Sequence, residues 1–404
     1  MGTVKPARLP SVLAVAAAAL LAPVPRAAAD DPDSGPGGFT PRVREAVDRG
    51  LRYLASTQRR DGAWEANVGF KINEGYNVTK YNVRDPGITA LAGTAFLAGG
   101  HLPGRGPYGE VLTKAVDYVL SVTDDKGCIA ENGTRMYSHA FAALFLAEVY
   151  GSSLDRDLNE RVREKLDRAV QYIVRAQNDQ GGWRYEANAA DSDMSVTVCQ
   201  VMALRAARNK GIRVPQKCID AAVTYVLESA VTRPGRRHFP SDNSMRPGAF
   251  KYQYRERNPI PTRASLALTG AAMTTLFGAG LYDDAAIQTW AREHSPDRFG
   301  RGGERPPTIA EMAQYILDEY DDHARDYPRH YFWYYGNYYA GQALYIAGNP
   351  WWDAYYPRVR DHLLRLQEPD GSWEVQWVGR NFGTAVGCVI LQVPCRYLPV
   401  LDQR

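Results

Sequence analysis

One short pattern recurs along this chain and constrains its fold more than any other feature. The pattern is Gln-x-x-x-Gly-x-Trp, and it occupies residues 58–64, 177–183 and 367–373. A degenerate copy at 125–129 keeps the Gly but has Ile129 where the other copies have Trp. Because a repeated unit buries its apolar face against its neighbours, the pattern predicts a repeat fold with one continuous core.

Each copy follows a stretch that has the spacing of an amphipathic helix. Before the second copy, Val162, Leu166, Val170 and Ile173 recur at steps of three and four, and charged residues fill the positions between them. This spacing predicts a helix with one apolar and one solvated face. The Gly that follows ends the helix by adopting a backbone conformation that other residues resist. Such outer helices are expected at 43–57, 111–122, 160–177, 217–228, 307–320 and 354–367.

The stretches that follow these outer helices are apolar on nearly all sides. They are rich in Ala, Gly, Leu, Val, Thr and aromatic residues, which predicts helices that are buried on most of their surface. These inner helices are expected at 88–98, 137–150, 195–208, 264–280, 334–347 and 384–398. Six outer helices around six inner ones predict an all-α fold, a single α/α toroid. An open solenoid is the alternative, but its terminal repeat would carry a polar capping face, and the last inner stretch is as apolar as the others.

The N-terminal residues have the pattern of an export signal. A basic start is followed by an apolar, Ala-rich run and by three alanines at 27–29, which predicts a signal peptide at 1–29. A Pro/Gly/Asp linker at 30–40 and the toroid at 41–404 follow. We therefore expect a secreted or periplasmic protein.

Charge and hydropathy narrow the classes of partner. A net charge of +3 over 404 residues argues against nucleic acid as a partner. No apolar stretch is long enough to span a bilayer, which leaves peripheral membrane contact as an open alternative. The sequence does not indicate an oligomeric state.

At these repeats the chain resembles the squalene–hopene cyclase and protein prenyltransferase repeat superfamily. The Gln-x-x-x-Gly-x-Trp elements are similar to the QW motif of that superfamily. The stretch 367–390 is similar to its QW repeat followed by an inner helix. The resemblance covers most of residues 41–404 and implies the α/α toroid, and it does not by itself select a reaction.

The resemblance also suggests a role for Asp191-Ser192-Asp193-Met194. In the triterpene cyclases of the superfamily, the middle Asp of an Asp-x-Asp-Asp motif protonates the substrate. Asp193 matches that position, whereas Met194 departs from the fourth. Burial and a neighbouring carboxylate such as Asp191 would keep such an acid protonated. The structural alternative is that both aspartates cap or anchor the inner helix that begins there.

Size and compartment depart from the cyclase pattern as well. The triterpene cyclases pair two barrel domains and act at a cytoplasmic membrane face. This chain has the length of one barrel and carries the pattern of an export signal.

A second group of candidate catalytic residues lies at the start of the second inner helix. Tyr137 and His139 would face the cavity mouth of a toroid, where they could act as base and acid on a polysaccharide. A His that is hydrogen-bonded beside a helix start is the structural alternative. Asp125, Cys128 and His139 provide the atom types of a prenyltransferase zinc site without a recognisable spacing. We therefore expect neither a metal nor another cofactor.

The densest aromatic cluster spans residues 331–339 at the fifth inner helix. Aromatic rings stabilise carbocations, stack on sugars or simply pack in a core. The expected substrate-binding residues of this cluster are Tyr331, Trp333, Tyr334, Asn337 and Tyr338. The loop 232–263 adds Arg236 and Arg237, which would attract an anionic ligand, with a solvated loop as the alternative.

Three functions are consistent with these residues. The first is a terpene-cyclase-like enzyme, in which Asp193 is the acid and the 331–339 cluster forms a dry, cation-stabilising wall. The second is an exported polysaccharide-active enzyme or glycan binder that uses Tyr137, His139 and the basic loop. The third is a non-catalytic toroid that holds a partner. The first two place a small molecule or a glycan in the central cavity, and whether the chain is an enzyme stays open at this point.

Overall fold

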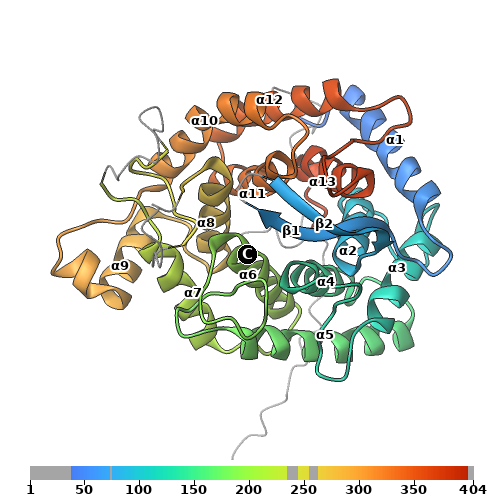
Figure 1. The fold of residues 1–404 in the computed structure, drawn as a ribbon, viewed down its shortest axis with the longest axis horizontal. Helices are drawn as coiled ribbons and strands as arrows, with labels where there is room; N and C mark the ends of the chain where they lie inside the picture. Colours follow the sequence, from blue (N-terminus) through green and yellow to red (C-terminus); the bar gives the residue numbers. More distant parts are fainter. Residues whose placement is uncertain (1–37, 73–74, 234–243, 254–262, 399–404) are drawn as a thin grey trace, which may run out of the picture.

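The computed structural model describes residues 38–72, 75–233, 244–253 and 263–398. Its helices form two concentric rings (Figure 1). The outer ring contains α1 (Pro41–Thr57), α3 (Gly109–Ser121), α5 (Arg156–Ala176), α7 (Gln216–Glu228), α10 (Ile309–Asp326) and α12 (Trp351–Leu366). The inner ring contains α2 (Pro86–Ala98), α4 (Met136–Val149), α6 (Met194–Asn209), α8 (Leu266–Gly278), α11 (Tyr331–Ala347) and α13 (Arg380–Gln392).

The inner ring closes on itself. Each inner helix packs against the next in chain order, and α13 packs against α2, so that the last repeat contacts the first. This arrangement confirms the predicted all-α toroid with six inner and six outer helices. The apolar surface of α13 is explained by closure, because a terminal repeat that meets another repeat needs no polar capping face.

The Gln and Trp side chains of the repeat hold each turn between an outer and an inner helix. The Gln177 amide donates to Gly181 O at 2.7 Å and to Cys218 O of α7 at 2.8 Å. The indole N–H of the fully buried Trp183 donates to Ile173 O of α5 at 2.8 Å. The other two copies make the same bonds, and the Gln367 amide reaches Ala46 O of α1 at 2.8 Å. Each Gln therefore links its own turn to the next outer helix, including across the closure of the ring.

Two segments depart from the predicted alternation of helices. The helix α9 (Asp284–His294) and the short η1 (Pro296–Gly300) pack against each other outside the ring, beside α7. The strands β1 (Glu65–Ile72) and β2 (Gly75–Arg84) form an antiparallel hairpin that crosses the centre of the ring in Figure 1. The sequence did not lead us to expect this hairpin.

The hairpin is anchored to the segment before α13. The backbone N–H of Asn67 donates to Val378 O at 3.0 Å, and its side-chain amide donates to Trp377 O at 2.7 Å. These bonds hold β1 beside the N-terminal end of α13, since Val378 lies two residues before the first residue of that helix.

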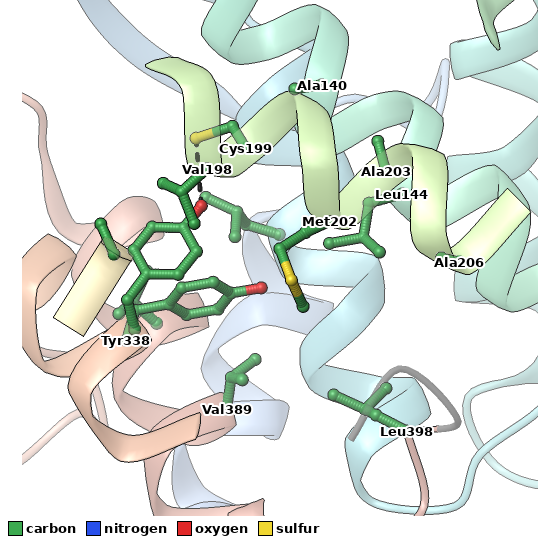
Figure 2. Packing of buried hydrophobic residues seen from close by; sticks show 14 of the residues in the cluster. Ala140, Leu144, Val198, Cys199, Met202, Ala203, Ala206, Tyr338, Val389 and Leu398 are labelled. Carbon is green, nitrogen blue, oxygen red and sulfur yellow. Dashed lines mark hydrogen bonds between the residues drawn. The ribbon is translucent and has the colours of Figure 1, made fainter. Parts of the chain in front are cut away.

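Apolar side chains fill the interior of the ring towards the other end of the inner helices. Figure 2 shows Cys199 and Met202 of α6, Tyr338 of α11 and Val389 of α13 packed together, with Leu398 below them. The short helix η2 (Val393–Cys395) leads the chain to this end.

The predicted signal peptide at 1–29 lies outside the described residues, and the domain bounds 30–40 and 41–404 stay predictions. Among the described helices, none is long and apolar enough to cross a membrane.

Candidate active site

Asp193 lies at the centre of a polar network at the N-terminus of α6. It is the N-cap residue, is fully buried, and its Oδ1 accepts the Val196 N–H at 2.8 Å and the Ser195 hydroxyl at 2.6 Å. The Arg184 guanidinium donates to its Oδ2 at 3.2 Å. Burial raises the pKa of Asp193, while the Ser195, Arg184, Val196 and Tyr252 donors oppose that rise. Both carboxylate oxygens are therefore held by donors.

Arg184 connects this carboxylate to further polar groups. It donates to the Tyr252 hydroxyl at 3.3 Å, and the hydroxyls of Tyr252 and Tyr185 are 2.8 Å apart. Its Nε lies 3.6 Å from Asp191 Oδ2, which also accepts the Gln253 amide at 3.0 Å. The structure thus brings both predicted aspartates to one guanidinium.

Two tyrosines approach the network from α4 and α11. The Tyr137 hydroxyl donates to Ser195 Oγ at 2.7 Å, and the Tyr335 hydroxyl donates to Ser195 O at 2.8 Å. The Tyr137 ring centroid lies 5.8 Å from that of Tyr185 and 6.3 Å from that of Tyr335. Burial raises the pKa of Tyr137 and Tyr335 well above 10, so both carry their protons at neutral pH. Both rings are half-buried, so they keep some surface that solvent reaches.

The hairpin contributes to the same site from above. The Lys71 ammonium lies 4.6 Å from the ring centroid of Phe332 and 5.9 Å from that of Tyr252. The ring of Tyr76 meets the ring of Tyr331 at 5.5 Å. One of the predicted substrate-binding residues, Tyr331 at the start of α11, therefore contacts the hairpin.

His139 occupies a different environment from Tyr137. It is fully buried; its Nδ1 accepts the Ile129 N–H at 3.0 Å, and its Nε2 lies 3.3 Å from Ala169 O. Burial lowers the pKa of His139 to about 4, so the ring is neutral. In four other repeats a Thr hydroxyl accepts the equivalent N–H, from Trp64 to Thr89, Trp183 to Thr197, Phe250 to Thr269 and Trp373 to Thr384. His139 thus has the position and the hydrogen bonds of a residue that holds its repeat together.

This position predicts how stability depends on pH. A His whose pKa is lower in the folded state than its unfolded value near 6.5 contributes stability above that value, which is lost as pH falls through the folded pKa. Between pH 7 and 4.5, His139 alone is expected to reduce the free energy of unfolding by about 2–3 kcal/mol. His139→Thr should keep the acceptor for Ile129 and remove that part of the acid sensitivity. Part of the acid sensitivity remains in this variant, because burial also lowers the pKa of His323 to about 4.

Denaturant unfolding of wild type and His139→Thr at both pH values measures the difference. Equal losses of stability in the two proteins would contradict the assignment of His139 as a buried neutral group.

Two of the predicted substrate-binding residues point away from Asp193, towards α12. The Trp333 ring is fully buried and stacks on His362 with centroids 4.3 Å apart. Asn337 accepts the Tyr355 hydroxyl at 2.7 Å and donates to Trp333 O at 2.8 Å. These contacts join α11 to the outer ring.

The other predicted residues fall in three places. The fully buried Tyr334 packs beside Phe382 of α13, and Tyr338 belongs to the apolar interior in Figure 2. Arg236 and Arg237 lie outside the described residues. Among the five predicted aromatic-cluster residues, only Tyr331 reaches the hairpin side of the site.

Sequence reasoning missed Arg184, Ser195 and Tyr252. Arg184 directly follows the Trp of the second repeat, and Ser195 lies two residues after Asp193, so both were within the stretch that drew attention. Nothing in the sequence pairs Tyr252 with them, because Tyr252 is 68 residues from Arg184 along the chain and meets it only in the folded structure.

The residues that could hold a metal do not converge. Within the described part of the chain, no group of three or more His, Cys, Asp and Glu side chains has a metal-binding arrangement. Both ring nitrogens of His139 face backbone groups, so Asp125 and Cys128 gain no third ligand from it.

Comparison with known proteins identifies other proteins that share this fold. No protein-family model and no curated protein matches the chain. Among solved structures, the α-1,6-mannanase GH76A of Salegentibacter sp. HEL1_6 is similar, with a TM-score of 0.56, 8% identity, and 88% of this chain and 99% of that chain covered. An unsaturated glucuronyl hydrolase specific for heparin has a TM-score of 0.50 and 13% identity over 87% of this chain and 96% of its own. A type II terpene cyclase from Scytonema has a TM-score of 0.46 and 13% identity over 89% and 98%.

The shared feature is the α/α toroid. At identities this low the similarity shows the fold alone, which hosts several chemistries. The α/α toroid that the repeats predicted is therefore confirmed, and no family model shows the squalene–hopene cyclase and prenyltransferase repeat superfamily itself.

Proposed function

We propose that the chain is a glycan-active enzyme whose ligand binds between the β1–β2 hairpin and the N-terminal ends of the inner helices. The observation that carries this proposal is the hydroxyl-rich, charged character of that surface. It presents the hydroxyls of Tyr137, Tyr185 and Tyr252 beside the Arg184 guanidinium, with Lys71 on the hairpin above. Sugars are bound by such a combination of aromatic faces and polar groups.

The environment of Asp193 supports a glycan over a polyprenoid. An acid that protonates an alkene has to carry its proton and touch the substrate. Asp193 has no exposed surface, and Arg184 and Ser195 donate to its two oxygens. These donors stabilise the carboxylate form. A carbocation would also meet the guanidinium of Arg184, since that group lies 5.0 Å from the Tyr185 ring and 5.6 Å from the Tyr252 ring.

The fold is consistent with this proposal. The two solved structures with TM-scores of 0.50 and 0.56 are named for action on heparin and on α-1,6-mannan. This is an argument from analogy, because fold alone does not select a function. We further propose that the protein acts outside the cytoplasm, on the basis of the signal-like pattern at 1–29.

A terpene-cyclase-like function is the second candidate. Burial raises the pKa of Asp193, and the side chains of Tyr137, Tyr252 and Tyr335 lie close to its carboxyl group. A raised pKa favours the protonated acid that such a reaction requires.

A thermal-shift screen separates these functions. The purified chain is heated with α-1,6-mannotetraose, with heparin-derived oligosaccharides and with geranylgeraniol in detergent micelles, each against a blank. We expect one of the two sugar arms to raise the Tm, because ligand that binds only the folded state stabilises it by RT ln(1 + [L]/Kd). Stabilisation by geranylgeraniol alone would support the second candidate, and no shift in any arm would favour the non-catalytic toroid.

Tyr335→Phe is the test variant for the same screen. This change removes the hydroxyl that donates to Ser195 O at 2.8 Å and keeps the ring. We expect a smaller shift from the sugar in this variant and an unchanged response to geranylgeraniol.

A further inference from the structure

We propose that Tyr137 is the catalytic residue of this site and that Ser195 links it to Asp193, which serves as the proton acceptor. The inference rests on the proposed function for the class of substrate. The connection between Tyr137 and Asp193 rests on geometry alone. The unbroken chain of hydrogen bonds runs from Tyr137 Oη to Ser195 Oγ at 2.7 Å and from Ser195 Oγ to Asp193 Oδ1 at 2.6 Å. It joins the first turn of α4 to the N-cap of α6.

Asp193 cannot act on a ligand directly. Its relative exposure is 0%, and Ser195, with 8%, is also buried. Tyr137 is only half-buried, so it keeps some accessible surface. A base that is sealed from the ligand reaches it only through groups that can pass a proton on, and a hydroxyl is both donor and acceptor.

The proton path is balanced at every step. Water or a sugar hydroxyl gives its proton to Tyr137 Oη as that oxygen gives its own proton to Ser195 Oγ. Ser195 passes its proton to the Asp193 carboxylate, whose Oδ1 becomes protonated. One O–H bond is broken in the water or sugar and one is formed on Asp193. The deprotonated oxygen bonds to the anomeric carbon as the glycosidic C–O bond breaks, and the return path delivers the proton from Asp193 to the leaving oxygen. Tyr137 and Ser195 are neutral before and after.

The groups around Tyr137 keep it neutral rather than ionised. Burial is the main cause of its raised pKa, and Asp193, Tyr185, Tyr335 and Tyr252 each disfavour a phenolate beside them as well. The nearest cation of the network, Arg184, is engaged by Asp193, Asp191 and the Tyr252 hydroxyl. A relay through a neutral hydroxyl is therefore the form of proton transfer that this environment permits.

Coupling between Tyr137 and Asp193 is measurable without any substrate. The ¹³Cγ resonance of Asp193, assigned by Asp193→Asn, is followed from pH 3 to pH 9 in wild type, Tyr137→Phe, Ser195→Ala and the double variant. Ser195→Ala removes a donor to the carboxylate, so the pKa of Asp193 should rise. Tyr137→Phe alone should also raise the pKa of Asp193, because the Ser195 hydroxyl becomes a weaker donor once its oxygen no longer accepts the Tyr137 hydrogen bond. In the Ser195→Ala background the same change should have no effect.

A matched control exists in the neighbouring repeat. The Ser138 hydroxyl donates at 3.0 Å to Asp85, a buried N-cap carboxylate of α2, and no tyrosine donates to Ser138 in the described structure. Ser138→Ala removes the same kind of bond and should leave the pKa of Asp193 unchanged.

Turnover of the sugar identified by the thermal-shift screen provides the second readout. Tyr137→Phe and Ser195→Ala should each lower kcat by about 10²–10⁴-fold with KM nearly unchanged, as expected for loss of acid–base catalysis. Ser195→Thr restores the hydroxyl and should recover most of the activity, whereas a purely structural role of Ser195 would not depend on it.

The outcomes separate this inference from the proposed function. Coupling in the NMR titration without turnover of any sugar would support the relay and refute the glycan-active assignment. The relay would be overturned if Tyr137→Phe kept the wild-type kcat, or if Tyr137→Phe alone left the pKa of Asp193 unchanged. Neither result would contradict the proposed function.

Discussion

Trp183→Ala is expected to lower the free energy of unfolding by about 3–5 kcal/mol, the usual effect of deleting a buried Trp side chain. The Trp183 side chain is fully buried, and its indole N–H is the donor to Ile173 O of α5. Removing it leaves a cavity between the outer and inner helices and a carbonyl without its partner. Because the third copy has the same geometry, Trp373→Ala should have an effect of similar size.

Urea or guanidinium unfolding measures this effect. Tyr81→Ala is the control, since that aromatic ring on the hairpin is 68% exposed and its removal should change stability by less than about 0.5 kcal/mol. A loss below about 1 kcal/mol in Trp183→Ala would mean that the repeat turns do not hold the rings together.

Arg184→Met is expected to lower the free energy of unfolding by about 3 kcal/mol near pH 8. The change leaves Asp193 as a buried carboxylate without its cationic partner, which is among the most destabilising kinds of substitution. Met retains much of the apolar stem of Arg, so lost packing contributes little. Replacing Asp193 with Asn in the same protein should recover part of the loss, because the buried charge is then gone.

The loss should grow with pH. A group whose pKa is raised in the folded state contributes stability at low pH, which is lost as pH rises through the folded pKa. Burial already raises the pKa of Asp193, and removal of Arg184 raises it further. Near pH 3 the carboxyl is protonated in both states, so wild type and Arg184→Met should approach each other there.

The control for this titration is Arg301→Met. Arg301 pairs with Asp297 on the surface, where the two side chains are 81% and 88% exposed, and surface pairs contribute little. A pH-independent difference between wild type and Arg184→Met would contradict the ion pair with Asp193.

The fold was largely predictable because its signal is repeated. Helical spacing in the outer stretches and nearly uniform apolarity in the inner ones are local properties, and six copies of each reinforce one another. The β1–β2 hairpin was missed because it occurs once, and its alternation is interrupted by register shifts between Ala66 and Gly69. A single short irregular hairpin gives a weak period-two signal.

The candidate site could be predicted from the sequence only where its residues lie close together along the chain. Asp191 and Asp193 were predicted from their motif, and Tyr137 from its position at a helix start. Ser195 is hydrogen-bonded to Tyr137, which is 58 residues away, and no local pattern reveals such a contact. The fourth member of the series in chain order, Phe250, shows how the structural role of His139 could have been predicted. Aligning the inner helices places a Thr at the position that His139 fills.

Calorimetric titration with the sugar identified by the thermal-shift screen measures whether the ligand binds at the Asp193 network. We expect saturable binding at one site in wild type and a weakened affinity in Arg184→Met, measured near pH 4, where the difference in stability between the two proteins is expected to be smaller than near pH 8. The affinity of Arg301→Met should be unchanged. Equal affinities in all three proteins would place the ligand away from the Asp193 network and contradict the proposed site.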